Sequence, residues 1–169
     1  NVCLWKAGCA KLDIKAQETM SIFTNHMDIA LDEARAAGQR GEVPVGAVIL
    51  SRDGQVIAQA GNETRAQNDP TAHAEILAIR AACSTLGRER LQGFDLYVTL
   101  EPCAMCAAAI AAARIGRVYY GASDPKSGGV AQGARVFDHA QSHHKPEVYD
   151  GISAKECENL LKDFFAAKR

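Results

Sequence analysis

Apolar positions along the chain follow two spacings, one typical of helices and one typical of strands. Between Thr24 and Ala37 they recur at helical spacing, and Gly38 is a suitable C-terminal stop. Two compact apolar runs follow, Val45–Leu50 and Val56–Ala60, with Arg52-Asp53-Gly54 between them. Because Asp-Gly is a common hairpin turn, this pattern predicts one helix followed by an antiparallel pair of strands.

Helices and strands then alternate through the middle of the chain. Asp69-Pro70 is typical of an N-cap followed by proline in the first helical position. The alternation predicts a βαβ unit whose parallel strands extend the hairpin sheet. The predicted elements are a helix over about Thr71–Ser84, a strand over Asp95–Leu100, a helix over Cys103–Ala113 and a strand over Arg117–Tyr120.

The C-terminal part is less regular. Residues 124–133 form a glycine-rich loop, residues 134–140 are weakly helical, and Val148-Tyr149 is a candidate final strand. A terminal helix is predicted over Ser153–Phe165, because Ser153 and Glu156 have the spacing of a capping box.

Composition and charge narrow the class of protein. With 169 residues and 47% hydrophobic residues, the chain is long and apolar enough for one domain with a substantial core. Its formal net charge of −1 excludes a positive electrostatic potential over the whole protein, so any contact with nucleic acid must come from a local basic patch. No apolar run is long enough for a transmembrane helix, and none is expected.

Six cysteines stand at positions 3, 9, 83, 103, 106 and 157. A chain with this much core does not need a disulfide framework. Cys83 and Cys157 lie in helical patterns, where a lone cysteine acts as a small buried hydrophobe. Only Cys103 and Cys106 have metal-ligand spacing, and free thiols of this kind fit the reducing cytoplasm.

Two short motifs together indicate a catalytic metal site: His73-Ala74-Glu75 and Pro102-Cys103-Ala104-Met105-Cys106. One imidazole and two thiolates provide three zinc ligands, and a fourth position open to water distinguishes a catalytic from a structural zinc site. Glu75 is then the proton carrier. Alone, the CxxC pair would fit a redox site or a structural zinc knuckle equally well, but the combination matches the signature of zinc-dependent nucleobase deaminases.

The spacing of His73 and Glu75 raises a geometric difficulty. Residues two apart on a regular helix point in opposite directions. Both reach one site only if the metal lies near the start of the helix. We therefore expect two helix N-termini, one after Asp69-Pro70 and one at Cys103, to meet over a single Zn²⁺ per chain.

Beyond this signature, the chain resembles the bacterial tRNA-specific adenosine deaminases from about Met27 to the C-terminus. The segments that match are Val43-Pro44-Val45-Gly46-Ala47-Val48, Gly61-Asn62, Asp69-Pro70-Thr71-Ala72-His73-Ala74-Glu75, Tyr97-Val98-Thr99-Leu100-Glu101-Pro102-Cys103-Ala104-Met105-Cys106, Arg114-Ile115-Gly116-Arg117-Val118 and Asp163-Phe164-Phe165.

The resemblance implies a cytidine-deaminase-like α/β/α sandwich around a mixed five-stranded sheet. It implies a homodimer that converts the wobble adenosine of a tRNA anticodon loop to inosine. By the same resemblance, Asn62 hydrogen-bonds the flipped purine and Asp124 lies near the target ribose. A turn role for Asp124 before Pro125 is an equally good interpretation. Several cations are candidates for phosphate contacts: Arg88, Arg90, Arg114, Arg117, Lys126, Arg135, Lys145 and Lys168-Arg169.

We treat residues 1–20 as an N-terminal extension and residues 21–169 as the zinc-dependent deaminase domain. The alternative within enzymes is a small-molecule deaminase of the guanine or cytosine type. The alternative from another class is a noncatalytic zinc-stabilised interaction module. Such a module would need a fourth protein ligand, and no further Cys or His is placed to supply it.

Overall fold

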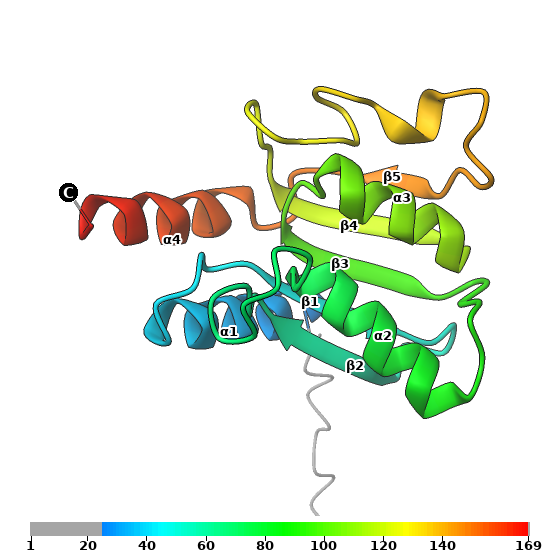
Figure 1. Cartoon of the computed structure of the whole chain (residues 1–169), viewed down its shortest axis with the longest axis horizontal. Helices are drawn as coiled ribbons and strands as arrows, with labels where there is room; N and C mark the ends of the chain where they lie inside the picture. The colour runs from blue at the N-terminus through cyan, green and yellow to red at the C-terminus, as the bar shows by residue number, and fades with distance from the viewer. Residues whose placement is uncertain (1–24, 169) are drawn as a thin grey trace, which may run out of the picture.

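A mixed five-stranded sheet lies at the centre of the molecule (Figure 1). In this computed structural model, which describes residues 25–168, the strand order is β2-β1-β3-β4-β5. The predicted N-terminal extension, residues 1–20, falls outside the described residues. The strands are β1 (Gly46–Leu50), β2 (Val56–Gly61), β3 (Asp95–Leu100), β4 (Arg117–Ala122) and β5 (Glu147–Tyr149).

The predicted pairings are confirmed. β1 and β2 form an antiparallel hairpin, and β1 also pairs antiparallel with β3. β3, β4 and β5 are parallel to one another, and the first two are joined through a helix as a βαβ unit. The carboxyl ends of β2, β3 and β4 therefore lie at one edge of the sheet, next to the start of β1.

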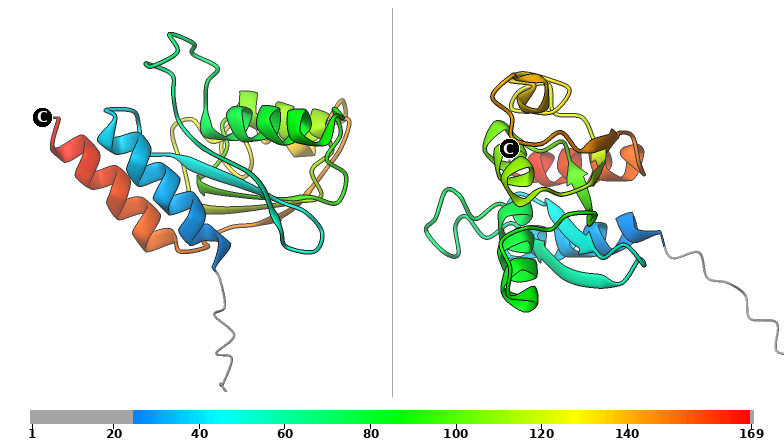
Figure 2. Two further views of the ribbon diagram at one scale, coloured as in Figure 1. Left: turned by 90° about the horizontal axis from the view of Figure 1, so that it is seen from below. Right: turned by 90° about the vertical axis from the view of Figure 1, so that its right-hand side faces the viewer.

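Within residues 25–168, four helices complete a three-layer α/β/α sandwich, as expected. α2 and α3 cover one face of the sheet, while α1 and α4 lie side by side on the other (Figure 2). The helices are α1 (His26–Gln39), α2 (Ala74–Leu86), α3 (Ala104–Ala113) and α4 (Ala154–Ala166). In the described part of the chain, no helix has the length and apolar character needed to cross a membrane.

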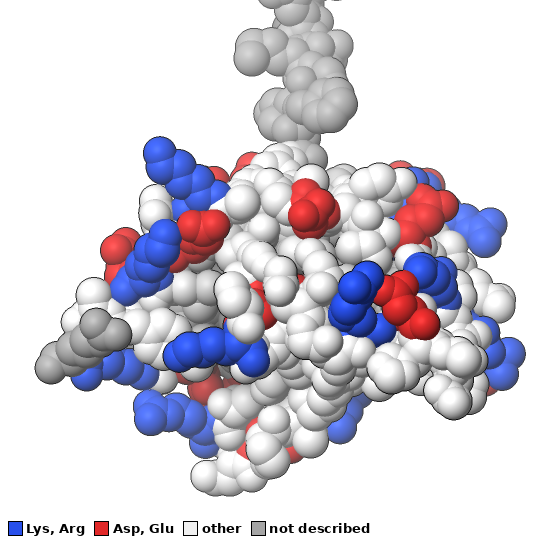
Figure 3. Space-filling view, turned by 90° about the horizontal axis from the view of Figure 1, so that it is seen from above, with Lys and Arg blue, Asp and Glu red and all other residues white. Residues whose placement is uncertain are grey.

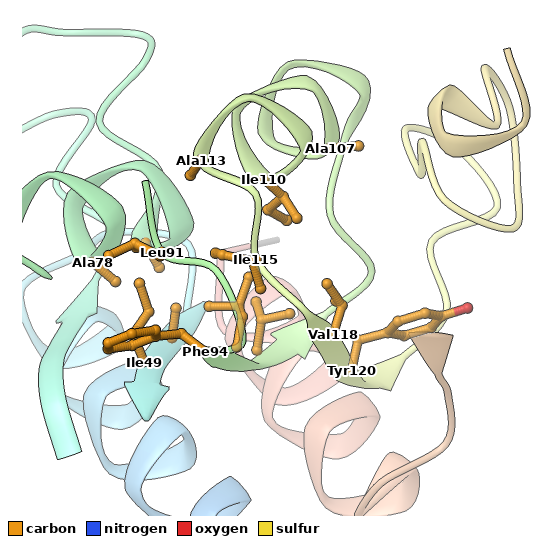
Figure 4. Packing of buried hydrophobic residues seen from close by; sticks show 14 of the residues in the cluster. Ile49, Ala78, Leu91, Phe94, Ala107, Ile110, Ala113, Ile115, Val118 and Tyr120 are labelled. Carbon is orange, nitrogen blue, oxygen red and sulfur yellow. The ribbon is translucent and has the colours of Figure 1, made fainter. Parts of the chain in front are cut away.

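Apolar side chains fill both interfaces between helices and sheet. The larger core lies between the sheet and α2 and α3, where Ile49, Ile110 and Val118 are fully buried (Figure 4). A smaller core lies on the other face, around Met27 and Leu31. This double burial explains why β1, which is covered on both faces, consists of continuous apolar residues instead of an alternating pattern.

Several helix termini differ from their sequence-based predictions, and three of the differences have a clear local cause. α2 begins at Ala74, three residues after the predicted start, because Asp69 caps a turn through its hydrogen bond with the Thr71 N–H at 2.8 Å. Gly38 lies inside α1, which continues to Gln39. The capping box at Ser153 is wrong: Ser153 has φ 53° and makes no side-chain cap hydrogen bond.

The weak helical pattern over residues 134–140 was also overestimated. Only a short 3₁₀ turn, η1 (Val136–Asp138), forms there. Phe137 is the buried residue of this turn and packs into the larger core. Phe137 and the partly buried Val136 hold the segment against the core and α3 without the repeated apolar stripe that a helix needs.

Candidate active site

The predicted site residues gather at the edge of the sheet where β2, β3 and β4 end. Cys103 follows β3, Asp124 follows β4 and Asn62 follows β2. His73 and Glu75 come from the start of α2, which crosses above β1 and β2. Ligand sites of open α/β sheets commonly lie in such crevices beyond the carboxyl ends of strands.

Two N-cap positions resolve the spacing problem at the metal site. His73 is the N-cap of α2 and Cys103 the N-cap of α3, and both have extended backbone angles (ψ 152° and 171°). Neither side chain caps its own helix, so both remain available to a shared centre. Because His73 lies outside the helical region, the rule that places residues two apart on opposite faces does not apply to His73 and Glu75.

The three proposed ligands converge on one point. The Nδ1 atom of His73 lies 3.7 Å from Cys103 Sγ and 3.5 Å from Cys106 Sγ. All three ligand atoms lie within 4.8 Å of one another. Tetrahedral zinc with ordinary Zn–N and Zn–S bond lengths would separate its nitrogen and sulfur ligands by about 3.6 Å. The spacing and the chemistry of this donor set therefore fit Zn²⁺.

The thiols and the imidazole are electrostatically coupled. The hydrogen bond with Cys106 lowers the pKa of Cys103 to about 4. The same contact and burial raise the pKa of Cys106, and the hydrogen bond with Cys103 raises the pKa of His73. This lowered pKa favours the thiolate form of Cys103, and thiolate is the form that coordinates metal.

A cavity of about 240 Å³ opens beside this cluster. His73 and Cys103 line it, and so does Glu75, whose side chain is only 3% exposed. Burial raises the pKa of Glu75 above its usual value. A buried carboxylate next to three convergent metal donors is an arrangement suited to proton transfer.

Asn62 and Asp124 line the same cavity and also have structural contacts. Asn62 accepts a hydrogen bond from the backbone N–H of Ala74 at 2.8 Å, which ties the end of β2 to the start of α2. Asp124 accepts hydrogen bonds from the N–H groups of Lys126 and Ser127. The turn interpretation of Asp124 is therefore confirmed, whereas the contacts of both residues with substrate stay predictions.

Two buried carboxylates near the cavity were missed by the sequence reasoning. Glu101, 2% exposed, accepts hydrogen bonds from the segment after β4, and Glu42, 1% exposed, accepts them from the segment after β2. For both groups burial alone would raise the pKa, but these hydrogen bonds outweigh burial and hold the pKa below its usual value. For Glu101 the available signal is a charged residue directly after the apolar strand β3, whereas Glu42 lies in the segment between α1 and β1 and has no such signal.

Comparisons with known proteins agree with this geometry. Residues 20–122 match the family model for the cytidine and deoxycytidylate deaminase zinc-binding region. The chain is 59% identical over 150 residues to a tRNA-specific adenosine deaminase of Agrobacterium fabrum, covering 89% of this chain and 98% of that protein.

Solved structures show the same fold. One, from a study of A-to-I editing by tRNA:A34 deaminases at the wobble position of transfer RNA, superposes with a TM-score of 0.78 at 60% identity, covering 80% of this chain and 97% of that one. A guanine deaminase from Nitrosomonas europaea has a TM-score of 0.72 at 22% identity, covering 83% and 82% of the two chains, and at that identity it shows the fold alone.

Proposed function

Because the chain belongs to the tRNA-specific adenosine deaminase family, we propose that it converts the wobble adenosine of a tRNA anticodon loop to inosine and releases ammonia. The observation that supports this most directly is the convergence of His73, Cys103 and Cys106 beside the buried Glu75, in a cavity open to the surface. An anticodon loop suits this site, since its bases are unpaired and can be splayed out at low cost.

His73, Cys103 and Cys106 would hold one zinc ion per chain. The chemistry expected of zinc in a three-ligand site is the supply of hydroxide at neutral pH. Glu75 would take up the proton of the attacking water and pass it to a ring nitrogen of the base. It would then take the proton of the hydroxyl group newly attached to the ring carbon and deliver it to the amino group, which leaves as ammonia. One carboxylate thus acts first as a base and then as an acid.

Asn62 would orient the purine. Its side-chain oxygen is occupied by the N–H of Ala74, so the amide nitrogen is the end that remains to donate to a ring nitrogen of the base. Asp124 lines the same cavity from the segment after β4, where it would face the ribose of the reacting nucleotide. Asn62 and Asp124 both line the cavity, at the ends of different strands.

A noncatalytic zinc module is a poorer fit. Among residues 25–168, the cluster that could hold a metal contains three donors, whereas structural zinc sites nearly always have four.

We also propose that the enzyme works as a homodimer in the cytoplasm. The dimer follows from the family resemblance, and the free cysteines of the described chain fit a reducing compartment. Light scattering of the purified protein tests the oligomeric state.

Incubation with an anticodon stem-loop that carries adenosine at the wobble position tests the proposed reaction, with inosine as the readout. A stem-loop with guanosine at that position is the matched control substrate. Free adenine, guanine, cytosine and their nucleosides are assayed in parallel. Inosine formed only in the adenosine stem-loop supports the proposal, and turnover confined to a free base or nucleoside would contradict it.

A further inference from the structure

Glu101 stands where β3 ends and the metal-binding turn begins. It follows Leu100, the last residue of β3, and precedes Pro102-Cys103. Its side chain is 2% exposed and borders the cavity. In the described chain no lysine or arginine forms an ion pair with it, so its negative charge must be balanced by other groups.

Those groups all come from residues 123–132, which we call the β4 loop. Oε1 of Glu101 accepts the N–H groups of Val130, Ala131 and Gln132 at 3.2, 2.8 and 2.9 Å. Oε2 accepts the Ser123 hydroxyl at 3.2 Å and the Asp124 N–H at 3.1 Å. Both ends of the loop are thus bound to one carboxylate, and charge-assisted hydrogen bonds of this kind are stronger than neutral ones.

Two glycines in the middle of the loop allow this close approach. A Cβ at Gly128 would lie 2.6 Å from both Cδ and Oε1 of Glu101, closer than real side chains pack. The N–H of Gly129 donates to the Pro102 carbonyl at 2.8 Å, and a Cβ there would lie 2.5 Å from the Ala104 nitrogen. The loop backbone therefore packs directly on the residues that flank Cys103.

The β4 loop also forms part of the cavity wall. Asp124 and Ser127 line the cavity together with Glu75 and Cys103. The segment after β2, with Asn62 and Thr64, contributes to the same lining. A nucleotide that presents its base to Glu75 in this cavity would therefore contact the β4 loop, so the conformation of the loop affects how the nucleotide fits.

We propose that Glu101 is a positioning residue for substrate: its buried carboxylate holds the β4 loop in the conformation that binds the nucleotides around the reacting base. This inference rests on the proposed function for its substrate. Glu101 does not touch the reacting atoms in this assignment. Its loss should therefore weaken substrate binding and leave the chemical step of a bound substrate largely intact.

Glu101→Gln tests the proposal with little change in side-chain size. An amide nitrogen in place of one carboxylate oxygen would face backbone N–H groups, donor against donor, so the loop must move. We expect KM for the anticodon stem-loop to rise about tenfold, with kcat within about twofold and one zinc still bound per chain. Gly128→Ala should give the same pattern, since its methyl group displaces the loop from the carboxylate without altering Glu101.

Asp95→Asn is the matched control. Asp95 is a second buried carboxylate, but it is the first residue of β3, at the opposite end of the strand from Glu101, and it pairs with Arg117. This variant should lose stability without a rise in KM. If Asp95→Asn raised KM as much as Glu101→Gln, a general loss of stability would explain both results and the proposal would be wrong. Loss of zinc, or a fall in kcat with unchanged KM, would equally overturn it.

Amide hydrogen exchange gives a readout that needs no substrate. In Glu101→Gln the amides of Val130, Ala131 and Gln132 should exchange faster, while those of α1 keep their protection. Unchanged exchange in the β4 loop would overturn the proposal. If the unmodified protein failed to deaminate any stem-loop, the proposed function would fail, whereas the exchange result would still show whether Glu101 holds the loop.

Discussion

Four buried carboxylates show how residue environment separates structural from chemical roles. Asp95 pairs with Arg117, and Glu42 and Glu101 accept backbone N–H groups that hold their pKa values down. Glu75 lies beside His73 and Cys103, and burial raises its pKa. Carboxylates whose surroundings shift their pKa values in opposite directions commonly have different functions.

Glu75 and Cys103 should be separable by mutation. Glu75→Ala removes the proton carrier and leaves the three donors in place, so we expect kcat to fall by about a thousandfold with zinc retained. Cys103→Ser removes a donor, so both zinc and activity should be lost. Zinc content by elemental analysis and inosine formation are measured on the same samples. Near-full activity in Glu75→Ala would contradict the assignment.

Glu42 should stabilise the fold at neutral pH and lose this effect in acid. Its folded-state pKa lies below the ordinary value of 4.5, so its contribution is present above that pH and disappears as pH falls through the lower folded pKa. At pH 7 Glu42→Gln should lower the free energy of unfolding by about 1–3 kcal/mol, because the N–H groups of Arg65 and Ala66 would donate to a neutral amide oxygen in place of a charged carboxylate.

Urea unfolding at a series of pH values measures this effect, and the difference between the original protein and Glu42→Gln should narrow below the pKa of Glu42. Glu158→Gln, on the exposed side of α4, is the control and should change stability by no more than about 0.5 kcal/mol. A difference that stays constant in acid would show that the charge of Glu42 contributes nothing.

At the scale of elements, the site depends on where two helices begin. α2 and α3 start with His73 and Cys103 as N-caps, and this places an imidazole and a sulfur at neighbouring helix ends. The apolar spacing in the sequence located both helices, but the first was extended three residues too far because Asp69-Pro70 looked like a helix start. The preference of a sequence for starting a helix at a given residue is weak. Here the hydrogen bond of Asp69 with the Thr71 N–H forms a turn, and the helix starts after it.

Packing of α1 on β1 predicts a strong effect at Gly46. A Cβ at this position would collide with the carbonyl oxygen of Ala30 and come within 2.5 Å of the Ala34 nitrogen, so helix and strand would have to separate. Gly46→Ala should lower the free energy of unfolding by more than about 2 kcal/mol. Chemical denaturation of Gly46→Ala and of the original protein measures this difference in the free energy of unfolding.

Gly38→Ala provides the comparison for Gly46→Ala. Gly38 lies inside α1, and its nearest neighbour would be Pro44 Cβ at 3.3 Å, a tight but adjustable contact. The gain in helix propensity, about 1 kcal/mol, should offset this contact. An equal loss of stability in both variants would mean that the close approach at Gly46 is unimportant.

At the scale of the whole molecule, charge is balanced and not concentrated. Lys, Arg, Asp and Glu side chains are interspersed on the face drawn in Figure 3, consistent with the net charge of −1. Several of the candidate phosphate contacts are already engaged: Arg117 pairs with Asp95, and Arg135 and Lys145 pair with Asp138. Lys126, in the β4 loop, forms no ion pair in the described chain and lies next to the cavity.

Binding of the anticodon stem-loop should therefore weaken as salt rises, through a few local contacts. Lys126→Gln should reduce the slope of log affinity against log salt by about 1, as expected for one lost phosphate contact. Arg35→Gln, an exposed cation of α1 paired with Asp32, should leave the slope unchanged. Affinities measured over a salt series test this, and binding that ignores salt would count against an RNA substrate.

By itself, the sequence determined the order of helices and strands, the hairpin and parallel pairings, and the set of residues with zinc-site chemistry. These are local properties, because apolar spacing, turn residues and short motifs each depend on residues only a few positions apart in the chain. The strand over Asp95–Leu100 was predicted to the residue.

Only the tertiary structure decided how groups distant in the chain meet. It brought His73 to within 4 Å of two thiols about thirty residues away, showed Asn62 bound to Ala74, and placed Glu101 and Glu42 as acceptors for two cavity loops. The physical reason is that no spacing of residues in the sequence predicts which groups a buried carboxylate will contact. Its role depends on which backbone N–H groups the packing of the sheet and helices delivers to it.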